Sequence, residues 1–238
     1  MALIHRILVI FGLGFCVVWS LICTLPLIIF RPVANLIGPF IQRGWGLGCL
    51  AFMGVRVTTL HENRIPQVGV VIAPNHESMF DILVMASQKK NFRWISKKEV
   101  GRIPFIGAAM RSLGAYFLKR DRSGSDMNVM KLVEKGLRQG HSVVIFPEGT
   151  RSVDGNLLPL KKGAFRTAQN GGVRVLPVGL AGTMGIASKG KWPSVWGHKV
   201  VVNYGEPFTI GPTEELQVAI ARFHETLLAL ILEARRHL

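Results

Sequence analysis

Runs of apolar residues divide this 238-residue chain into two parts. Residues 7–30 contain no charged side chain, and Arg6 and Arg31 flank this run. A helix of this length would extend about 36 Å, enough to cross a hydrocarbon core of roughly 30 Å, and Pro26 should kink or end it near its C-terminus. A weaker apolar segment covers residues 33–54. The pattern predicts membrane anchor helices in residues 1–56, followed by a domain of residues 57–238.

The second apolar segment leaves three membrane arrangements open. It contains Pro39, Gln42 and Arg43 together with several glycines. It can therefore be a second spanning helix, a re-entrant partner of the first, or an amphipathic helix at the interface. A two-helix hairpin that anchors the chain is the arrangement we expect. A cleaved signal peptide fits less well, because its apolar core is shorter and no clear small-residue cleavage site is found.

Beyond residue 57, short continuous apolar runs alternate with amphipathic stretches. Such runs, bounded by turn residues, predict buried strands, and apolar positions three and four apart predict helices. The predicted strands are 68–73, 114–118, 142–146, 173–180 and 199–204. The predicted helices are 80–85, 125–139, 163–170 and a last one from Thr213, with Glu214 and Glu215 in its first turn and an apolar face of Leu216, Ile220, Phe223, Leu227 and Leu230. This alternation predicts an α/β fold with a mixed, mainly parallel sheet flanked by helices.

The composition combines apolar character with positive charge. Apolar residues make up 49% of the chain, Lys and Arg outnumber Asp and Glu by 29 to 14, and the isoelectric point is about 10.5. This combination suits a protein that works at an anionic membrane. No nucleic-acid partner is expected, because the N-terminus is apolar and no zinc-finger, basic-zipper or RNA-binding motif is found. The three cysteines, all in the apolar N-terminal third, give no disulfide framework.

Residues with acid–base chemistry follow the first predicted strand. A neutral imidazole such as His76 can accept a proton from an attacking hydroxyl, and a carboxylate such as Asp81 can fix its tautomer. On one ideal helix the two side chains would lie about 140° apart. They can meet if His76 lies in the turn before the helix, with Asn75 and Ser78 as candidate caps. The same spacing also arises by chance, and a hydrogen-bonded core histidine is the simpler alternative.

A second polar segment, residues 148–151, follows a later predicted strand. The guanidinium of Arg151 provides a planar fork that fits a phosphate. Gly149 permits close backbone approach, and Thr150 adds a hydroxyl donor. Glu148 can orient Arg151 or accept a hydrogen bond from a glycerol hydroxyl, and a surface turn with an internal ion pair is the simpler alternative. A nearby basic segment either adds phosphate contacts or forms a solvated face: Lys161-Lys162-Gly163.

In their order and separation, these segments resemble the glycerolipid acyltransferase family, specifically the 1-acyl-glycerol-3-phosphate acyltransferases. The resemblance covers roughly residues 68–204. The blocks that match are Asn75-His76-x4-Asp81, then Lys98-Glu99, Pro104, Gly107, Gly114 and Arg120, then residues 146–152 with Glu148-Gly149-Thr150-Arg151, and finally Leu176-Pro177-Val178. Four blocks in register are far more specific than one pair of residues.

The resemblance implies a reaction and roles for these residues. A fatty acyl group would move from an acyl thioester to the sn-2 hydroxyl of lysophosphatidic acid, giving phosphatidic acid in phospholipid biosynthesis. His76 would be the general base and Asp81 its orienting carboxylate, and backbone N–H groups near this turn are candidate oxyanion donors. The residues implied to hold glycerol phosphate are Arg120, Glu148, Gly149, Thr150 and Arg151.

The resemblance also implies how the substrates reach the protein. Acyl-CoA or acyl carrier protein would deliver the acyl group, with no metal and no bound cofactor. The N-terminal helices would hold the protein in the inner cell membrane, with the catalytic domain on the cytoplasmic side. Acceptance of another lysolipid, such as lyso-ornithine lipid, is an alternative, as is a non-catalytic protein that binds anionic membranes. A serine hydrolase is not indicated, because the chain has no Gly-x-Ser-x-Gly elbow.

Overall fold

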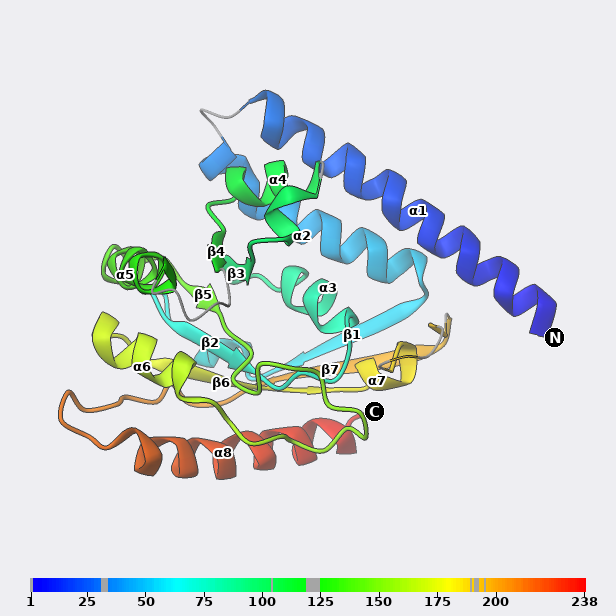
Figure 1. Cartoon of the computed structure of the whole chain (residues 1–238). Helices are drawn as coiled ribbons and strands as arrows, with labels where there is room; N and C mark the ends of the chain where they lie inside the picture. Colours follow the sequence, from blue (N-terminus) through cyan, green and yellow to red (C-terminus); the bar gives the residue numbers. More distant parts are fainter. Residues whose placement is uncertain are drawn as a thin grey trace.

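A seven-stranded β-sheet forms the centre of the molecule (Figure 1). The computed structural model describes residues 2–30, 34–103, 105–118, 125–188, 190, 193–194 and 196–238, so Arg31, Pro104 and Arg120 lie outside the described residues. The strand order is β1-β7-β6-β2-β5-β3-β4. The strands are β1 (Val55–Leu60), β2 (Val71–Pro74), β3 (Arg93–Lys97), β4 (Tyr116–Leu118), β5 (Val143–Val144), β6 (Val175–Ala181) and β7 (His198–Tyr204).

Neighbouring strands run mostly in the same direction. Every described strand pair is parallel except β6 with β7, which is antiparallel. The prediction of a mixed, mainly parallel sheet is therefore confirmed. Both β2 and β6 are buried along their whole length, because helices cover both faces of the sheet. This two-sided burial explains why the two strands are continuous apolar runs in the sequence.

Two strands, β1 and β3, were not predicted. Strand β1 lies at the edge of the sheet, where it pairs with β7, and most of its residues are partly exposed. In β3 only Trp94 is buried, and basic residues occupy both ends. Neither strand contains the long apolar run on which the prediction relied. Strand β1 also contains the predicted domain boundary between residues 56 and 57, and the division into two units stays a prediction.

Helices pack on both faces of the sheet (Figure 1). Because successive side chains of a strand point to opposite faces, Val70 and Ile72 pack in one apolar cluster and Val71 and Ala73 in another. The first cluster includes residues of α1, α2 and α3, and the second includes residues of α5, α6 and α8. The helices are α1 (Ala2–Ile29), α2 (Ala34–Phe52), α3 (Phe80–Ala86), α4 (Ile106–Ser112), α5 (Ser125–Arg138), α6 (Lys162–Gly171), α7 (Thr183–Ile186) and α8 (Leu216–Arg236). The short helices α4 and α7 were not predicted.

The last helix, α8, presents the predicted apolar face to the sheet. Its residues Ile220, Phe223, Leu227 and Leu230 are buried. The helix begins at Leu216, three residues later than predicted, so Glu214 and Glu215 precede it. The Glu214 carboxylate accepts a hydrogen bond from the Gly211 N–H at 3.0 Å, which closes a turn before the helix instead of extending it.

The two N-terminal helices lie side by side as a hairpin (Figure 1). The Trp19 indole donates to the Gly44 carbonyl at 3.2 Å, and the Trp45 indole donates to the Ser20 hydroxyl at 2.8 Å. Helix α1 continues through Pro26 and ends at Ile29. The segment of residues 9–26 in α1 is long and apolar enough to cross a membrane. Among the described residues, no other helix meets both conditions.

The hairpin also packs on the α/β domain. Helix α2 contacts α3, and α1 contacts α4. Gly46 of α2 lies so close to α3 that a Cβ atom there would be 2.6 Å from the Ser87 backbone nitrogen. Helix α2 is therefore placed directly against the helix that follows His76.

Candidate active site

The turn that contains His76 is fixed to the sheet by the residue before it. Asn75 follows the last residue of β2 and is 2% exposed. Its amide nitrogen donates to the Leu180 carbonyl at 3.0 Å, and its amide oxygen accepts the Leu180 N–H at 2.6 Å. The side chain thus continues the β2–β6 pairing beyond Pro74. Asn75 therefore anchors the turn to β6. The capping role considered for Asn75 from the sequence is not observed.

His76 and Asp81 form a hydrogen-bonded pair across this turn. The distance between His76 Nδ1 and Asp81 Oδ2 is 2.7 Å. His76 lies before α3, and Asp81 is the second residue of that helix. The expectation that the two side chains meet in this way is confirmed. With Asp81 accepting the Nδ1 hydrogen, His76 Nε2 keeps a lone pair, which is the state that a general base requires.

The Asp81 carboxylate is held by four donors and is fully buried. Besides the imidazole, Oδ2 accepts the backbone N–H groups of Glu77 at 2.7 Å and Ser78 at 2.8 Å. The hydroxyl of Thr183, on α7, donates to Oδ1. Donors on both oxygens fix the orientation of the carboxylate. The Thr183 contact joins residues 102 positions apart, so no local sequence signal could have predicted it.

The His76 ring is also held from the side. It stacks on the Phe146 ring, with centroids 4.0 Å apart and ring planes inclined by 21°. Phe146 follows β5, the strand next to β2 in the sheet. The His76 side chain remains 16% exposed. The imidazole is therefore oriented on one edge by Asp81 and on one face by Phe146, while part of it stays accessible.

Glu148 connects the two sequence segments. Its Oε1 accepts the His76 N–H at 2.6 Å, and its Oε2 accepts the Leu158 N–H at 2.9 Å. Glu148 is 2% exposed, and this burial raises the pKa of its carboxyl group. The carboxylate neither pairs with Arg151 nor faces solvent. The geometry places Glu148 as a support for the His76 turn, and a direct contact with glycerol phosphate stays a prediction.

The residues after Glu148 form a turn with basic side chains beside it. Gly149 has φ +69°, and a Cβ atom there would lie 2.8 Å from Lys161 Nζ. The Lys161 ammonium thus lies against Gly149, a closer approach than the sequence alone indicated. Thr150 is exposed and Arg151 is partly buried. Arg120, the other basic residue implied at this site, lies outside the described residues.

The backbone donors near His76 are already used. The N–H groups of His76, Glu77 and Ser78 all donate to the carboxylates of Glu148 and Asp81. The suggestion that N–H groups of this turn stabilise an oxyanion is therefore wrong for these three. Within the described ranges, no three His, Cys, Asp or Glu side chains are grouped as metal ligands.

Comparisons with known proteins place this site in a family. A family model described as Acyltransferase matches residues 56–181. The chain is similar to a chloroplastic 1-acyl-sn-glycerol-3-phosphate acyltransferase of Arabidopsis thaliana, with 37% identity over 72% of this chain and 51% of that protein. It is also similar to a lyso-ornithine lipid O-acyltransferase of Rhodobacter capsulatus, with 35% identity over 49% of this chain and 41% of that protein.

A solved structure has the same fold. The crystal structure of a 1-acyl-sn-glycerophosphate acyltransferase from Thermotoga maritima matches with a TM-score of 0.83 and 23% identity, over 99% of this chain and 96% of that chain. The chain spans about half of the length of the curated relatives it matches. Because the family model matches more than half of this chain, the protein belongs to the Acyltransferase family.

Proposed function

We propose that this protein is a 1-acyl-sn-glycerol-3-phosphate acyltransferase. It transfers a fatty acyl group from an acyl thioester to the sn-2 hydroxyl of lysophosphatidic acid, and the product is phosphatidic acid. The observation that carries this proposal is the His76–Asp81 pair at 2.7 Å, held by Glu148 in a protein of the Acyltransferase family. The Arabidopsis relative, named for this activity, supports the choice of reaction.

In the proposed mechanism, His76 moves one proton. Its Nε2 accepts the proton of the sn-2 hydroxyl as the oxygen attacks the thioester carbonyl. Asp81 stabilises the imidazolium that forms. The tetrahedral intermediate then collapses, the C–S bond breaks, and the thiolate takes the proton from His76. The new ester bond and the free thiol account for all atoms of the two substrates.

The phosphate of the acceptor binds beside Gly149. A partly buried guanidinium at Arg151 and the Lys161 ammonium against Gly149 supply positive charge there, and the Thr150 hydroxyl adds a donor. Arg120 is proposed as a further phosphate ligand from the family resemblance. Glu148 acts through the backbone of His76, because both of its oxygens accept main-chain N–H groups.

The acceptor lipid reaches this site from the membrane. Helix α1 exposes large apolar side chains, including Phe11 at 72%, and α2 exposes Phe40 at 76%. Such an exposed apolar surface on two packed helices fits a lipid environment. We place the protein in the cell membrane with its α/β domain on the cytoplasmic side, where acyl-CoA or acyl carrier protein delivers the acyl group. The excess of basic residues suits anionic lipid headgroups and an acidic carrier.

A lyso-ornithine lipid is the second candidate acceptor. The Rhodobacter capsulatus relative is named for this substrate, which offers the same kind of hydroxyl without a phosphate. The basic residues beside Gly149 favour a phosphate-bearing acceptor.

A non-catalytic role in binding anionic membranes is the alternative from another class. This alternative predicts that substitutions of His76 and Asp81 leave vesicle binding unaltered. It also predicts that no acyl thioester is turned over.

An acyl-transfer assay tests the proposal. Purified full-length protein is incubated with lysophosphatidic acid or lyso-ornithine lipid and with a panel of acyl-CoA and acyl carrier protein donors. We expect phosphatidic acid from the first acceptor and a loss of roughly 10²- to 10⁴-fold in kcat for His76→Ala, without loss of folding. Full activity of His76→Ala would disprove the mechanism. Turnover of the ornithine lipid alone would change the acceptor and keep the chemistry.

A further inference from the structure

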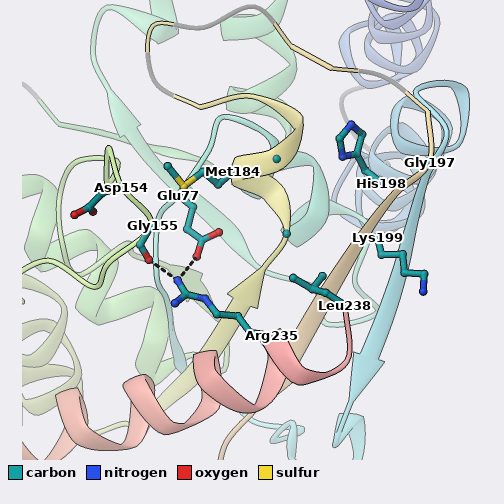
Figure 2. A pocket seen from close by; sticks show the side chains of 11 residues that line it. Glu77, Asp154, Gly155, Met184, Gly197, His198, Lys199, Arg235 and Leu238 are labelled. Carbon is teal, nitrogen blue, oxygen red and sulfur yellow. Dashed lines mark hydrogen bonds and ion pairs between the residues drawn. The ribbon is translucent and has the colours of Figure 1, made fainter.

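Arg235, near the end of α8, contacts both segments that hold His76 (Figure 2). Its Nη2 donates to Glu77 Oε1 at 3.4 Å and to the Gly155 carbonyl. Both acceptors, like the guanidinium, line a cavity of about 710 Å³. The Glu77 side chain is 5% exposed, so this contact is made by a buried carboxylate.

Each acceptor of Arg235 is connected to His76, Glu77 directly through the chain and Gly155 through Ser152. On one side, Glu77 follows His76 in the chain, and its N–H donates to Asp81 Oδ2 at 2.7 Å. On the other side, the Gly155 N–H donates to the Ser152 hydroxyl at 3.0 Å, and the Ser152 N–H donates to the His76 carbonyl at 2.8 Å. One guanidinium thus joins the turn after β2 to the loop after β5.

We propose that Arg235 is a positioning residue for acyl transfer, which keeps His76 aligned by joining Glu77 to the loop that carries Ser152 and Gly155. This inference rests on the proposed function. Arg235 acts through its neighbours and does not touch the reacting atoms. The position of α8 thereby becomes part of the active-site geometry, although α8 lies on the opposite face of the sheet from α3 (Figure 1).

Arg235 has an electrostatic effect as well as a geometric one. Burial, and then the neighbouring charge of Asp81, raise the pKa of Glu77 to about 7, while Arg235 acts in the opposite direction. Among the described residues, His76 and Asp81 lie on the same turn as Glu77. The cavity is also lined by Asp154, His198, Lys199 and the last residue of the chain, Leu238. Removing the guanidinium therefore raises the pKa of Glu77 further, and a smaller fraction of Glu77 is ionised near pH 7.

Kinetics of the full-length enzyme test this proposal. Arg235→Met should lower kcat by about 10- to 100-fold with little change in KM, because small misplacements of catalytic groups have effects of this size. Arg236→Met removes the same charge from the next, exposed position of α8 and should leave kcat unchanged. Arg235→Lys should keep part of the activity. Wild-type kcat in Arg235→Met would overturn the proposal.

Two readouts separate positioning from a general structural role. Because Arg235 lines an open cavity, guanidinium ions added to Arg235→Ala should restore part of kcat, and they should not affect Arg236→Ala. The pH–kcat profile of Arg235→Met should be displaced to higher pH relative to wild type. When Glu77→Gln is present in both proteins, adding Arg235→Met should cause no such displacement. A loss of activity with neither rescue nor displacement would overturn the proposal.

A third readout does not depend on the reaction. Hydrogen exchange measured by mass spectrometry should become faster in residues 75–81 and 152–158 of Arg235→Met, and should stay unchanged in Arg236→Met. If wild type turns over no acceptor while this exchange pattern is observed, the proposed function fails and the positioning role of Arg235 stands. Unchanged exchange in both segments would overturn the positioning role even if wild type is an active acyltransferase.

Discussion

The backbone N–H of His76 donates to the Glu148 carboxylate at 2.6 Å, across 72 positions of the chain. The second oxygen of the carboxylate accepts the Leu158 N–H at 2.9 Å, so both carboxylate oxygens are held by backbone N–H groups. The ring of His76 is oriented by Asp81, and its main chain is oriented by Glu148. The two sequence segments are therefore parts of a single support for one imidazole.

Replacing Glu148 tests this support. In Glu148→Gln, the amide oxygen can accept one N–H, and the amide nitrogen would face the other donor. A buried N–H without an acceptor costs about 1–3 kcal/mol, and the turn should shift to relieve this cost. We expect kcat to fall by about 10- to 100-fold, with a smaller change in KM for either substrate. The control is Glu225→Gln at an exposed position of α8, and equal activities of the two variants would contradict the supporting role.

The Thr183 hydroxyl tests the orientation of Asp81. Thr183→Val has nearly the same shape and removes the donor to Asp81 Oδ1. A hydrogen bond to a charged group contributes about 1.5–3 kcal/mol, and part of this should appear as a lower kcat, by up to about tenfold. Thr183→Ser keeps the hydroxyl and should retain most of the activity. If the Ser and Val variants lose the same activity, packing and not the hydrogen bond is responsible.

The sequence predicted those parts of the site that lie within short segments. His76 and Asp81 are five positions apart, and each segment follows an apolar strand, so their chemistry and their place at strand ends could be inferred together. The contacts of Thr183, Leu158 and Arg235 depend on how β6, α8 and the loop after β5 fold back on the turn. A single sequence contains no periodicity or spacing that reports such distant contacts.

The same distinction applies to the fold. The buried strands β2 and β6 were predicted from their apolar runs, whereas the partly exposed β1 and β3 were not. Burial on both faces leaves a strong pattern in the sequence, and partial exposure leaves a weak one. The support that Glu148 gives to the His76 backbone was not predicted, for a related reason. An acidic residue in a polar turn is expected to face solvent or substrate, and only the structure places it under the His76 backbone.

Gly149 tests the position of the phosphate. A side chain at φ +69° is strained by about 1–2 kcal/mol. A Cβ atom at Gly149 would lie only 2.8 Å from Lys161 Nζ, so the Lys161 ammonium would have to move. We expect Gly149→Ala to raise KM for lysophosphatidic acid more than it lowers kcat. Gly140→Ala is the matched control, because Gly140 also has a positive φ, +90°, and a Cβ atom there meets nothing within 4 Å. An unchanged KM in Gly149→Ala would argue against a phosphate at this turn.

The buried carboxyl of Glu77 predicts a pH dependence of stability. Its pKa is raised from 4.5 to about 7, chiefly by burial. Between these two pH values the native protein holds a proton that the unfolded chain has released, so the free energy of unfolding falls as pH rises through this window. The whole shift corresponds to about 3 kcal/mol.

Glu77→Gln removes this titration and therefore part of the pH dependence. Relative to wild type, the Gln variant should gain apparent melting temperature between about pH 5 and about pH 8, because it has no proton to lose in that range. Thermal unfolding in detergent or lipid vesicles measures the difference. Glu225→Gln, which changes an exposed carboxylate on α8, should follow wild type at both pH values. A constant difference between wild type and Glu77→Gln would show that Glu77 is already ionised at the lower pH, with Arg235 as a stronger partner than its 3.4 Å contact suggests.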